Sequence, residues 1–320
     1  MSNPSELRNT DSTSYYRPDI DGLRGLSVIC VVLYHLFPYF FMNGFLGVDI
    51  FFVISGFVVT QAFIKNLNSG RLLGLKIFYK NRMKRILPAL YFNSLISILL
   101  CMLFISPYEL GSIFKTAAAS ILGLSNLALW YAGFDYFSPD VSLNPFGHTW
   151  SLGVEEQFYV IFPFVFVLIT SIFYKRDYLK YFLIGATIFS FIFWTNLRLD
   201  ATIIEAFYNP FARFWELLIG VLLYLYKDKI NGFKVAFIFE IIVVLIFTLT
   251  IFYQASWANS LFYNIVAVFF AGFFIATGDN SIFSILLKKR FMIYIGKISY
   301  SLYLWHFTVF VLFNWTIGLE

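Results

Sequence analysis

The stretch DGLRGLSVICVVLYHLFPYF, residues 21–40, decides the fold class. It is mostly apolar and about as long as the roughly 20 residues that a helix needs to cross a bilayer. Similar runs recur along the 320-residue chain, which is 60% hydrophobic and only 13% charged, whereas soluble domains are about 25% charged. The sequence therefore predicts a polytopic integral membrane protein, and it raises the question of why this stretch carries Arg24 and His35.

The apolar runs are continuous rather than alternating, so we expect an all-α bundle, because only helices and closed barrels satisfy their backbone in lipid. Residues 1–21 are polar and are expected to form a cytoplasmic tail without a cleaved signal peptide, followed by a membrane domain over residues 22–320. We expect about nine transmembrane helices, over residues 22–41, 44–64, 86–106, 151–173, 180–197, 211–226, 235–253, 259–277 and 292–314.

Segment 113–131 is apolar enough to be a further span, but the charges argue against a crossing. Without that crossing, the cytoplasmic side holds all of the 23 Lys and Arg residues except Lys115, Arg198 and Arg213, as the positive-inside rule requires. We therefore predict an interfacial or re-entrant helix within an external loop over residues 107–150, with the N-terminus cytoplasmic and the C-terminus outside.

Several polar side chains are predicted to share one depth in the outer half of the bundle. A helix rises by about 1.5 Å per residue, which puts His35 roughly 16 Å above Arg24. Charged or titratable groups at membrane depth are costly, so each is a functional candidate. The predicted polar layer consists of His35, Asp49, His148, Trp150, Glu155, Glu156, Arg213, Glu216 and His306. The alternatives are that Arg213 and Glu216 form a structural ion pair, that His306 only packs, and that Asp49 only fixes a helix contact.

A histidine beside a carboxylate is suited to general-base catalysis. We predict that His35 is the catalytic base and that Asp49, Glu155 or Glu156 orients it. The chain has no Gly-x-Ser-x-Gly motif that would indicate a serine hydrolase. Its three histidines lack the spacing of a zinc motif, so no metal site is expected.

The inner side is expected to carry a different chemistry, in the stretch FYKNRMKRILPAL. Arg82 and Arg85 lie three residues apart, and two guanidinium groups can hold phosphate oxygens bidentately. A helix beginning at Pro88 would add its positive end. The alternative for this basic cluster, above all for its lysines, is membrane orientation and attraction to anionic lipid.

Six stretches follow one another from residue 16 to residue 307: YRPDIDGLRGLSVICVVLYH, FLGVDIFFVISGFVVT, FYKNRMKRILPAL, HTWSLGVEEQFYVIFP, RFWELLIG and IGKISYSLYLWHF. In this order they resemble the acyltransferase-3 family, bacterial membrane O-acyltransferases that acylate cell-surface carbohydrates. The arginine and histidine that this family carries in its first helix fall on Arg24 and His35, and its paired arginines fall on Arg82 and Arg85.

The resemblance implies an enzyme of the bacterial plasma membrane that moves an acyl group, expected to be acetyl, from cytoplasmic acyl-CoA to a hydroxyl of an external carbohydrate. Acyl-CoA is then a co-substrate, and no bound cofactor is expected. Arg24, Arg82 and Arg85 are expected to bind the donor, and His35 to act as base or to accept the acyl group. The family continues with one more span, which residues 22–320 are expected to lack.

Two other function classes remain open on the sequence. A proton-coupled transporter or flippase of a glycan or lipid-linked intermediate would have the same composition and the same buried charges. The paired arginines and the absence of inverted repeats favour the acyltransferase. A sensor or assembly subunit without chemistry is the third class. Nucleic acid is not an expected partner, because the basic residues fall between the spans.

Overall fold

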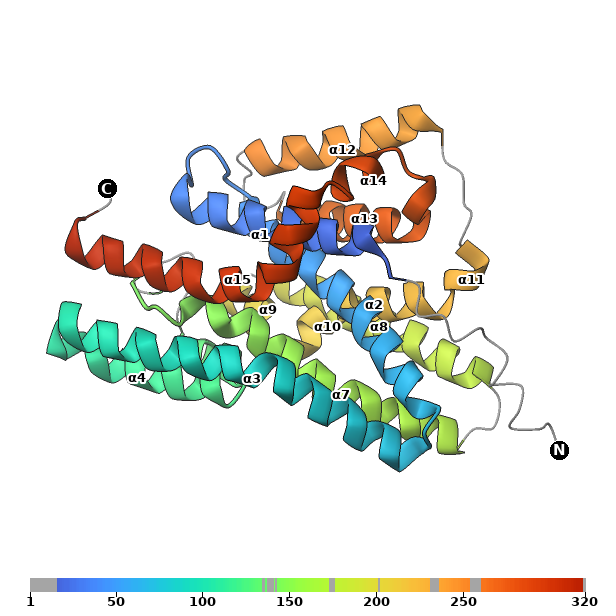
Figure 1. Ribbon diagram of the computed structural model, residues 1–320, viewed down its shortest axis with the longest axis horizontal. Coiled ribbons are helices and arrows are strands. Elements are labelled where there is room, and N and C mark those ends of the chain that lie inside the picture. Colours follow the sequence, from blue (N-terminus) through green and yellow to red (C-terminus); the bar gives the residue numbers. More distant parts are fainter. Residues whose placement is uncertain are drawn as a thin grey trace.

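A computed structural model describes residues 16–133, 136, 141, 143–172, 176–200, 202–230, 236–253 and 260–318. All regular elements in these ranges are helices, which confirms the all-α prediction for the described part of the chain. Figure 1 shows α3, α4 and α7 along one side of the molecule and α12, α13 and α14 along the opposite side, with α1, α2 and α15 between them.

The longer helices match the predicted spans in order, and each predicted span overlaps one of them. The helices are α1 (Pro18–Leu36), α2 (Gly47–Leu67), α3 (Arg71–Phe104), α4 (Pro107–Ile121), α5 (Ser125–Tyr131), α7 (Trp150–Ile172), α8 (Arg176–Leu199), α9 (Ile203–Tyr208), α10 (Pro210–Leu225), α11 (Lys227–Ile230), α12 (Phe237–Phe252), α13 (Ser260–Thr277), α14 (Phe283–Leu287) and α15 (Arg290–Thr316). In the described ranges, five segments are long and apolar enough to cross a membrane: Gly44–Leu67, Arg71–Phe104, Gly147–Ile172, Asp177–Leu199 and Leu261–Asn280. The chain is thus a polytopic membrane protein by length and composition.

The prediction of a helix start at Pro88 is wrong. Pro88 lies inside α3, a continuous helix of 34 residues that also carries Arg82 and Arg85. A proline removes one backbone hydrogen bond inside a helix, and membrane helices tolerate this where neighbouring groups compensate. The two arginines therefore project from the middle of a helix and have no helix N-terminus beside them.

The first predicted span is shorter than the apolar run suggested. Helix α1 ends at Leu36, so His35 lies in its last turn rather than well inside a longer helix. Pro38 explains the early end, because a proline disfavours helical backbone at the residue before it. Phe37 indeed has φ −137° and ψ 63°, outside the helical region.

Among the described residues of the segment 107–133, two helices, α4 and α5, lie where one was predicted over residues 113–131. Leu122, Gly123 and Leu124 separate them, and Gly123 has a φ of +69°, in the left-handed region that favours glycine. Helix α4 packs beside α3, and α5 packs beside α7. Neither α4 nor α5 is among the five segments long and apolar enough to span a bilayer.

Two helix pairs approach each other through glycines. On α1 and α15, a Cβ at Gly25 would lie 2.5 Å from the Met292 carbonyl oxygen, and one at Gly296 would lie 1.7 Å from that of Asp21. On α2 and α10, Gly56 lies against the carbonyl of Leu217. Small residues let membrane helices pack backbone to backbone, and these two contacts hold together the helices that carry the site.

Candidate functional site

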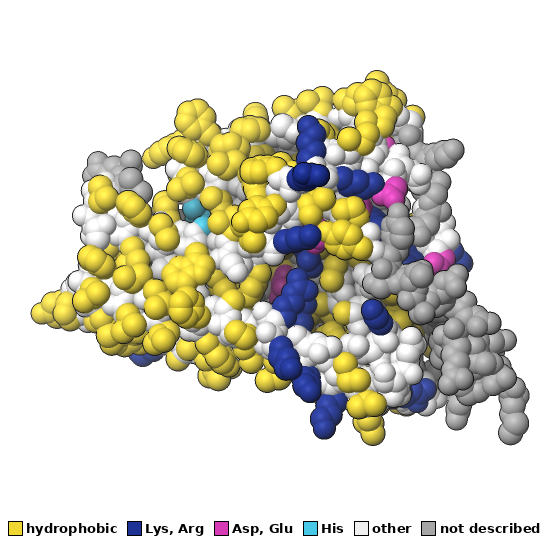
Figure 2. All heavy atoms as spheres, in the orientation of Figure 1, with side chains coloured by type: hydrophobic (Ala, Val, Ile, Leu, Met, Phe, Trp, Pro, Cys, Tyr) yellow, Lys and Arg dark blue, Asp and Glu magenta, His cyan; other side chains and the backbone are white. Residues whose placement is uncertain are grey.

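A cavity of about 100 Å³ lies between α1, α2, α3, α7 and α15. The structure brings Arg24, Arg82 and Arg85 together in its wall, although they come from two helices. The remaining charged residues that line it are Lys297, Glu155 and Glu156. Figure 2 draws the molecule in the orientation of Figure 1 and shows Lys and Arg side chains in a band across the middle of the visible face, with acidic side chains between them.

The arginines and the acids are held by neighbouring side chains. The Arg82 guanidinium carbon lies 3.8 Å from the centre of the Tyr159 ring, in the range of a cation–π contact. Glu155 accepts hydrogen bonds from the Tyr159 hydroxyl at 2.6 Å and the Ser55 hydroxyl at 2.9 Å. Arg24 pairs with Asp21 on its own helix at 3.6 Å. Arg82 and Glu155 thus meet through one tyrosine.

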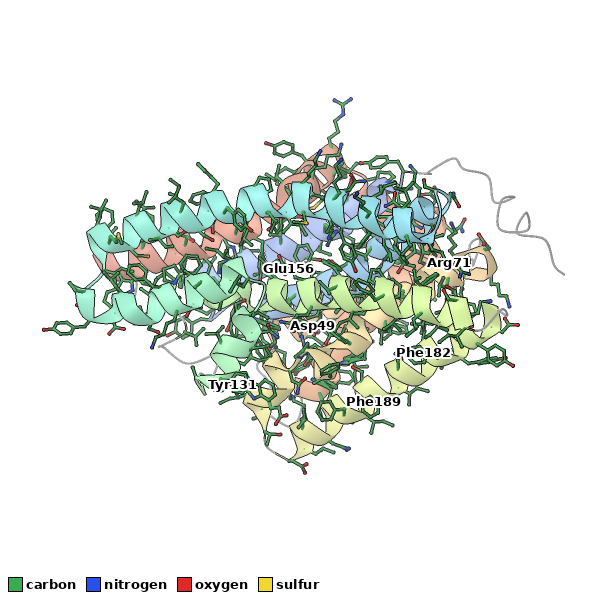
Figure 3. All side chains as sticks on the ribbon, turned by 90° about the horizontal axis from the view of Figure 1, so that it is seen from below. Asp49, Arg71, Tyr131, Glu156, Phe182 and Phe189 are labelled. Carbon is green, nitrogen blue, oxygen red and sulfur yellow. The ribbon has the colours of Figure 1, made fainter. Side chains whose placement is uncertain are left out.

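Glu156 lies next to the turn between α4 and α5. A Cβ at Gly123 would come within 2.3 Å of a Glu156 carboxylate oxygen, so the turn lies directly against this carboxylate. Figure 3 shows Glu156 and Asp49 near the middle of the bundle, on different helices. The turn between α4 and α5 therefore contacts the cavity wall through Gly123.

Tyr303 and Ser151 also line the cavity and share a hydrogen bond, and the Tyr303 ring packs against His148 and His306 of a cluster of histidines. Three helices agree on the separation between the basic end and this cluster. From the residue spacing, it is roughly 16 Å between Arg24 and His35, roughly 14 Å between Lys297 and His306, and roughly 16 Å between Tyr159 and His148. The cations and the imidazoles therefore occupy opposite ends of one region.

All three histidines of the chain meet in this cluster. The ring centres of His35 and His306 are 5.2 Å apart, and those of His148 and His306 are 5.6 Å apart. His35 and His148 are buried, whereas His306 is partly exposed. Among the described residues, no group of three or more His, Cys, Asp or Glu side chains is arranged to hold a metal ion.

Hydrogen bonds fix the tautomer of His35. Its Nδ1 lies 2.9 Å from the Val31 carbonyl oxygen, which can only accept, so Nδ1 carries the proton and Nε2 has the lone pair. The Tyr136 hydroxyl lies 3.3 Å from this Nε2. Burial is the main cause that raises the pKa of Tyr136 well above its ordinary value, so this hydroxyl keeps its proton and donates to His35.

His306 has the same tautomer. Its Nδ1 donates to the carbonyl oxygens of Tyr303 at 2.7 Å and Leu302 at 3.2 Å. Its Nε2 is buried and has no hydrogen-bond partner among the described residues. The cluster thus contains two imidazoles whose Nε2 atoms are able to accept a proton.

Asp49 belongs to a second buried cluster. Its carboxylate accepts hydrogen bonds from Arg213 at 3.0 Å and from Asn264 at 2.7 Å. Arg213 also pairs with Glu216 at 3.0 Å, as the ion-pair alternative expected. In the described ranges, the side-chain hydrogen bonds of His35 go to Val31 and Tyr136, not to a carboxylate.

Aromatic rings connect the two clusters. The Arg213 guanidinium carbon lies 5.6 Å from the Trp150 ring centre and 5.9 Å from that of Phe207. Both rings also pack against Tyr136, at 5.9 Å and 4.9 Å between ring centres. Trp150 therefore lies between the buried ion pair and the tyrosine that contacts His35.

Sequence reasoning missed three residues of this region, Ser151, Tyr303 and Asn264, and it missed the contact of Tyr136 with His35. Asn264 carried a usable signal, because it is an amide within an apolar span. Tyr303 lies one helical turn before His306 and therefore on the same face. Tyr136 carried no comparable signal, since it comes from a loop whose path the sequence does not specify.

Comparisons with known proteins show the family to which the chain belongs. The family described as an acyltransferase domain, acyltransferase-3, matches residues 17–318. The chain belongs to the acyltransferase-3 family. This acyltransferase-3 chain is 32% identical to the O-acetyltransferase OatA of Staphylococcus aureus strain NCTC 8325 over 321 residues, which cover 93% of the chain and 51% of OatA.

A second relative is the putative O-acetyltransferase SAS0844 of Staphylococcus aureus strain MSSA476. It is 31% identical over 314 residues, covering 92% of this chain and 50% of the relative. The acyltransferase-3 chain thus spans about half the length of these curated relatives. No solved structure matches it.

Proposed function

We propose that this protein is a membrane O-acyltransferase that moves an acetyl group from cytoplasmic acetyl-CoA to a hydroxyl of an external carbohydrate. The observation that carries the proposal is the cavity whose basic end holds three arginines and whose far end borders three histidines. Family membership and the two O-acetyltransferase relatives support the reaction class.

The proposed orientation follows from the same arrangement. All nine predicted spans cross the plasma membrane of a bacterium, with the N-terminus inside, and α4 and α5 lie at the outer surface. Arg24, Arg82 and Arg85 then face the cytoplasm and hold the phosphates of the donor. Guanidinium groups suit this task because they bind phosphate oxygens in pairs. The pantetheine arm extends through the cavity toward the histidines.

His35 serves as the general base of the proposed reaction. The carbohydrate hydroxyl gives its proton to Nε2 while its oxygen attacks the thioester carbonyl carbon. The carbon–sulfur bond then breaks, and the departing CoA thiolate takes back the proton. The Tyr136 hydroxyl occupies this Nε2 at 3.3 Å, a long hydrogen bond that the acceptor hydroxyl is able to replace.

The three carboxylates that were predicted to orient His35 have different roles in this proposal. Val31 and Tyr136 orient His35, because they are the groups hydrogen-bonded to its ring. Asp49 holds Arg213, whereas Glu155 and Glu156 line the path of the donor arm. A covalent acyl-histidine is the other chemical route, and labelled acetyl-CoA without acceptor would leave its label on His35 only by that route.

The test is the His35→Ala variant in a strain that lacks the native gene. A general base contributes about 10²–10⁴-fold to the rate, so ester-linked acetate released by mild alkali from the surface glycans should fall to the level of the deletion strain. Cys30→Ala is the matched control, because Cys30 is also buried on α1 but lies outside the cluster. Both variants should accumulate in the membrane and bind CoA.

Full acetylation by His35→Ala would refute the assignment of the base. Acetylation that is the same in the deletion strain and its parent would refute the function as a whole. Purified protein should in addition release CoA from acetyl-CoA when the surface glycan is added. A proton-coupled transporter would change glycan export without releasing CoA.

A further inference from the structure

Tyr303 lies between the donor cavity and the histidine cluster. Its side chain lines the cavity, and its ring centre is 5.3 Å from that of His148 and 5.5 Å from that of His306. An acyl group that enters from the basic end and approaches the histidines therefore meets this ring.

The Tyr303 ring is held in place from several sides. Its hydroxyl donates to the His148 carbonyl oxygen at 2.9 Å and shares a hydrogen bond with the Ser151 hydroxyl at 2.7 Å. The residue is only 5% exposed, and Phe51 packs against it with ring centres 6.3 Å apart. Swinging the ring away would break both hydrogen bonds in a buried setting, which is unfavourable.

The cavity becomes apolar toward Tyr303. The order of the lining residues along the helices gives this direction: Val48 and Phe51 precede Ser55 on α2, and Ser151 and Leu152 precede Glu155 and Tyr159 on α7. Phe51 contacts Tyr303, whereas Tyr159 contacts Arg82. The phosphates of a donor favour the basic end, so its acyl group lies at the apolar end. A wall fixed at that end limits how far an acyl chain can extend.

We propose that Tyr303 determines acyl-chain length, and that its ring restricts the enzyme to short acyl groups such as acetyl. This inference rests on the proposed function. A longer chain has to displace a ring that is packed and hydrogen-bonded, and close-packed sites accommodate added methylenes poorly. One methylene in an apolar pocket changes specificity by about 10–200-fold, so butyryl-CoA should be a much poorer donor than acetyl-CoA.

The experiment compares Tyr303→Ala with Tyr303→Phe. The parent and both variants are assayed for kcat/KM with acetyl-, propionyl- and butyryl-CoA. Tyr303→Ala removes the wall and should raise the ratio of butyryl to acetyl transfer at least tenfold. Tyr303→Phe keeps the ring and should retain the preference of the parent. Tyr303→Leu, which keeps an apolar side chain but shortens it, replaces the alanine variant if that variant does not accumulate.

Binding gives a second readout that does not depend on turnover. In the His35→Ala background, calorimetry should show weaker binding of butyryl-CoA than of acetyl-CoA, and Tyr303→Ala should remove the difference. The inference is overturned if the His35→Ala protein binds both donors equally, or if adding Tyr303→Ala leaves the ratio of the two affinities unchanged. Failure of every donor to release CoA, together with a binding ratio that responds to Tyr303, would instead contradict the proposed function and leave the length limit standing.

Discussion

The contact between α2 and α10 provides the sharpest test of the fold. A Cβ placed on Gly56 would lie 1.9 Å from the Leu217 carbonyl oxygen, whereas ordinary contact begins at 3.4 Å. Alanine at this position therefore has to move the two backbones apart by about 1.5 Å, the difference between these distances. Gly220 on α10 makes the reciprocal contact, because a Cβ placed on it would lie 2.0 Å from the Val53 carbonyl oxygen.

Two effects of Gly56→Ala oppose each other. Alanine stabilises a helix interior by about 1 kcal/mol relative to glycine. Overpacking of a filled core costs about 1–3 kcal/mol, and more where backbone must move. The separation also strains the Asp49–Arg213 ion pair, which joins the same two helices at 3.0 Å. Because the backbones must move, the cost lies at or above the upper end of that range, and subtracting the gain in helix propensity leaves an expected net loss of about 2 kcal/mol or more in the free energy of unfolding.

The assay is thermal unfolding of purified protein in detergent, with two glycine controls. A Cβ on Gly272 would meet only the Leu223 side chain at 3.6 Å, and one on Gly185 would meet nothing within 4 Å. Gly272→Ala and Gly185→Ala should unfold at or slightly above the parental temperature, because they gain helix propensity without a clash. Equal unfolding temperatures for Gly56→Ala and Gly185→Ala would refute the close packing of α2 and α10.

Two further predictions concern the charged residues. Asp49→Asn removes one of the two buried carboxylates that pair with Arg213, the other being Glu216. Breaking a buried ion pair costs about 3–5 kcal/mol, so the unfolding temperature should drop. The double variant with Arg213→Gln should recover part of the loss, and strictly additive losses would argue against the pair. Arg82→Ala should weaken CoA binding, measured by calorimetry, roughly 10–100-fold, as expected for the loss of a charge-assisted hydrogen bond of about 1.5–3 kcal/mol. The control is Lys84→Ala, which makes the same charge change at an exposed position on α3 and should leave the affinity nearly unchanged. Equal effects of both variants would indicate general electrostatic attraction rather than a specific site.

The sequence predicted the helices and their order because each apolar run had to form one helix in lipid. It predicted their ends less well. Helix α1 ends early because of Pro38. The prediction of a span to residue 41 gave more weight to the length of the apolar run than to this proline. Pro88 was misjudged in the opposite direction, because the packing of α3 against its neighbours tolerates a proline that would break an isolated helix.

Depth could be argued from residue spacing, but lateral neighbours could not. Helical rise places His35 and Asp49 at similar levels, yet Asp49 pairs with Arg213 from α10 and His35 contacts Tyr136, which follows α5 in the chain. Which side chains meet at one level depends on how each helix is rotated and which helices are adjacent. These features arise from packing across the whole bundle. Glycines such as Gly56 indicate a close helix contact, but the sequence does not say which helix is the partner.

The unbroken course of α3 links distant parts of the site by register. Arg82 and Arg85 project from it toward the cavity, and further along the same helix Ser97 lies 3.0 Å from Thr308, two residues beyond His306 on α15. Adding or deleting one residue between Arg85 and Ser97 would turn one group relative to the other by about 100°. This stretch of α3 therefore has to keep a fixed number of residues for both groups to stay in place.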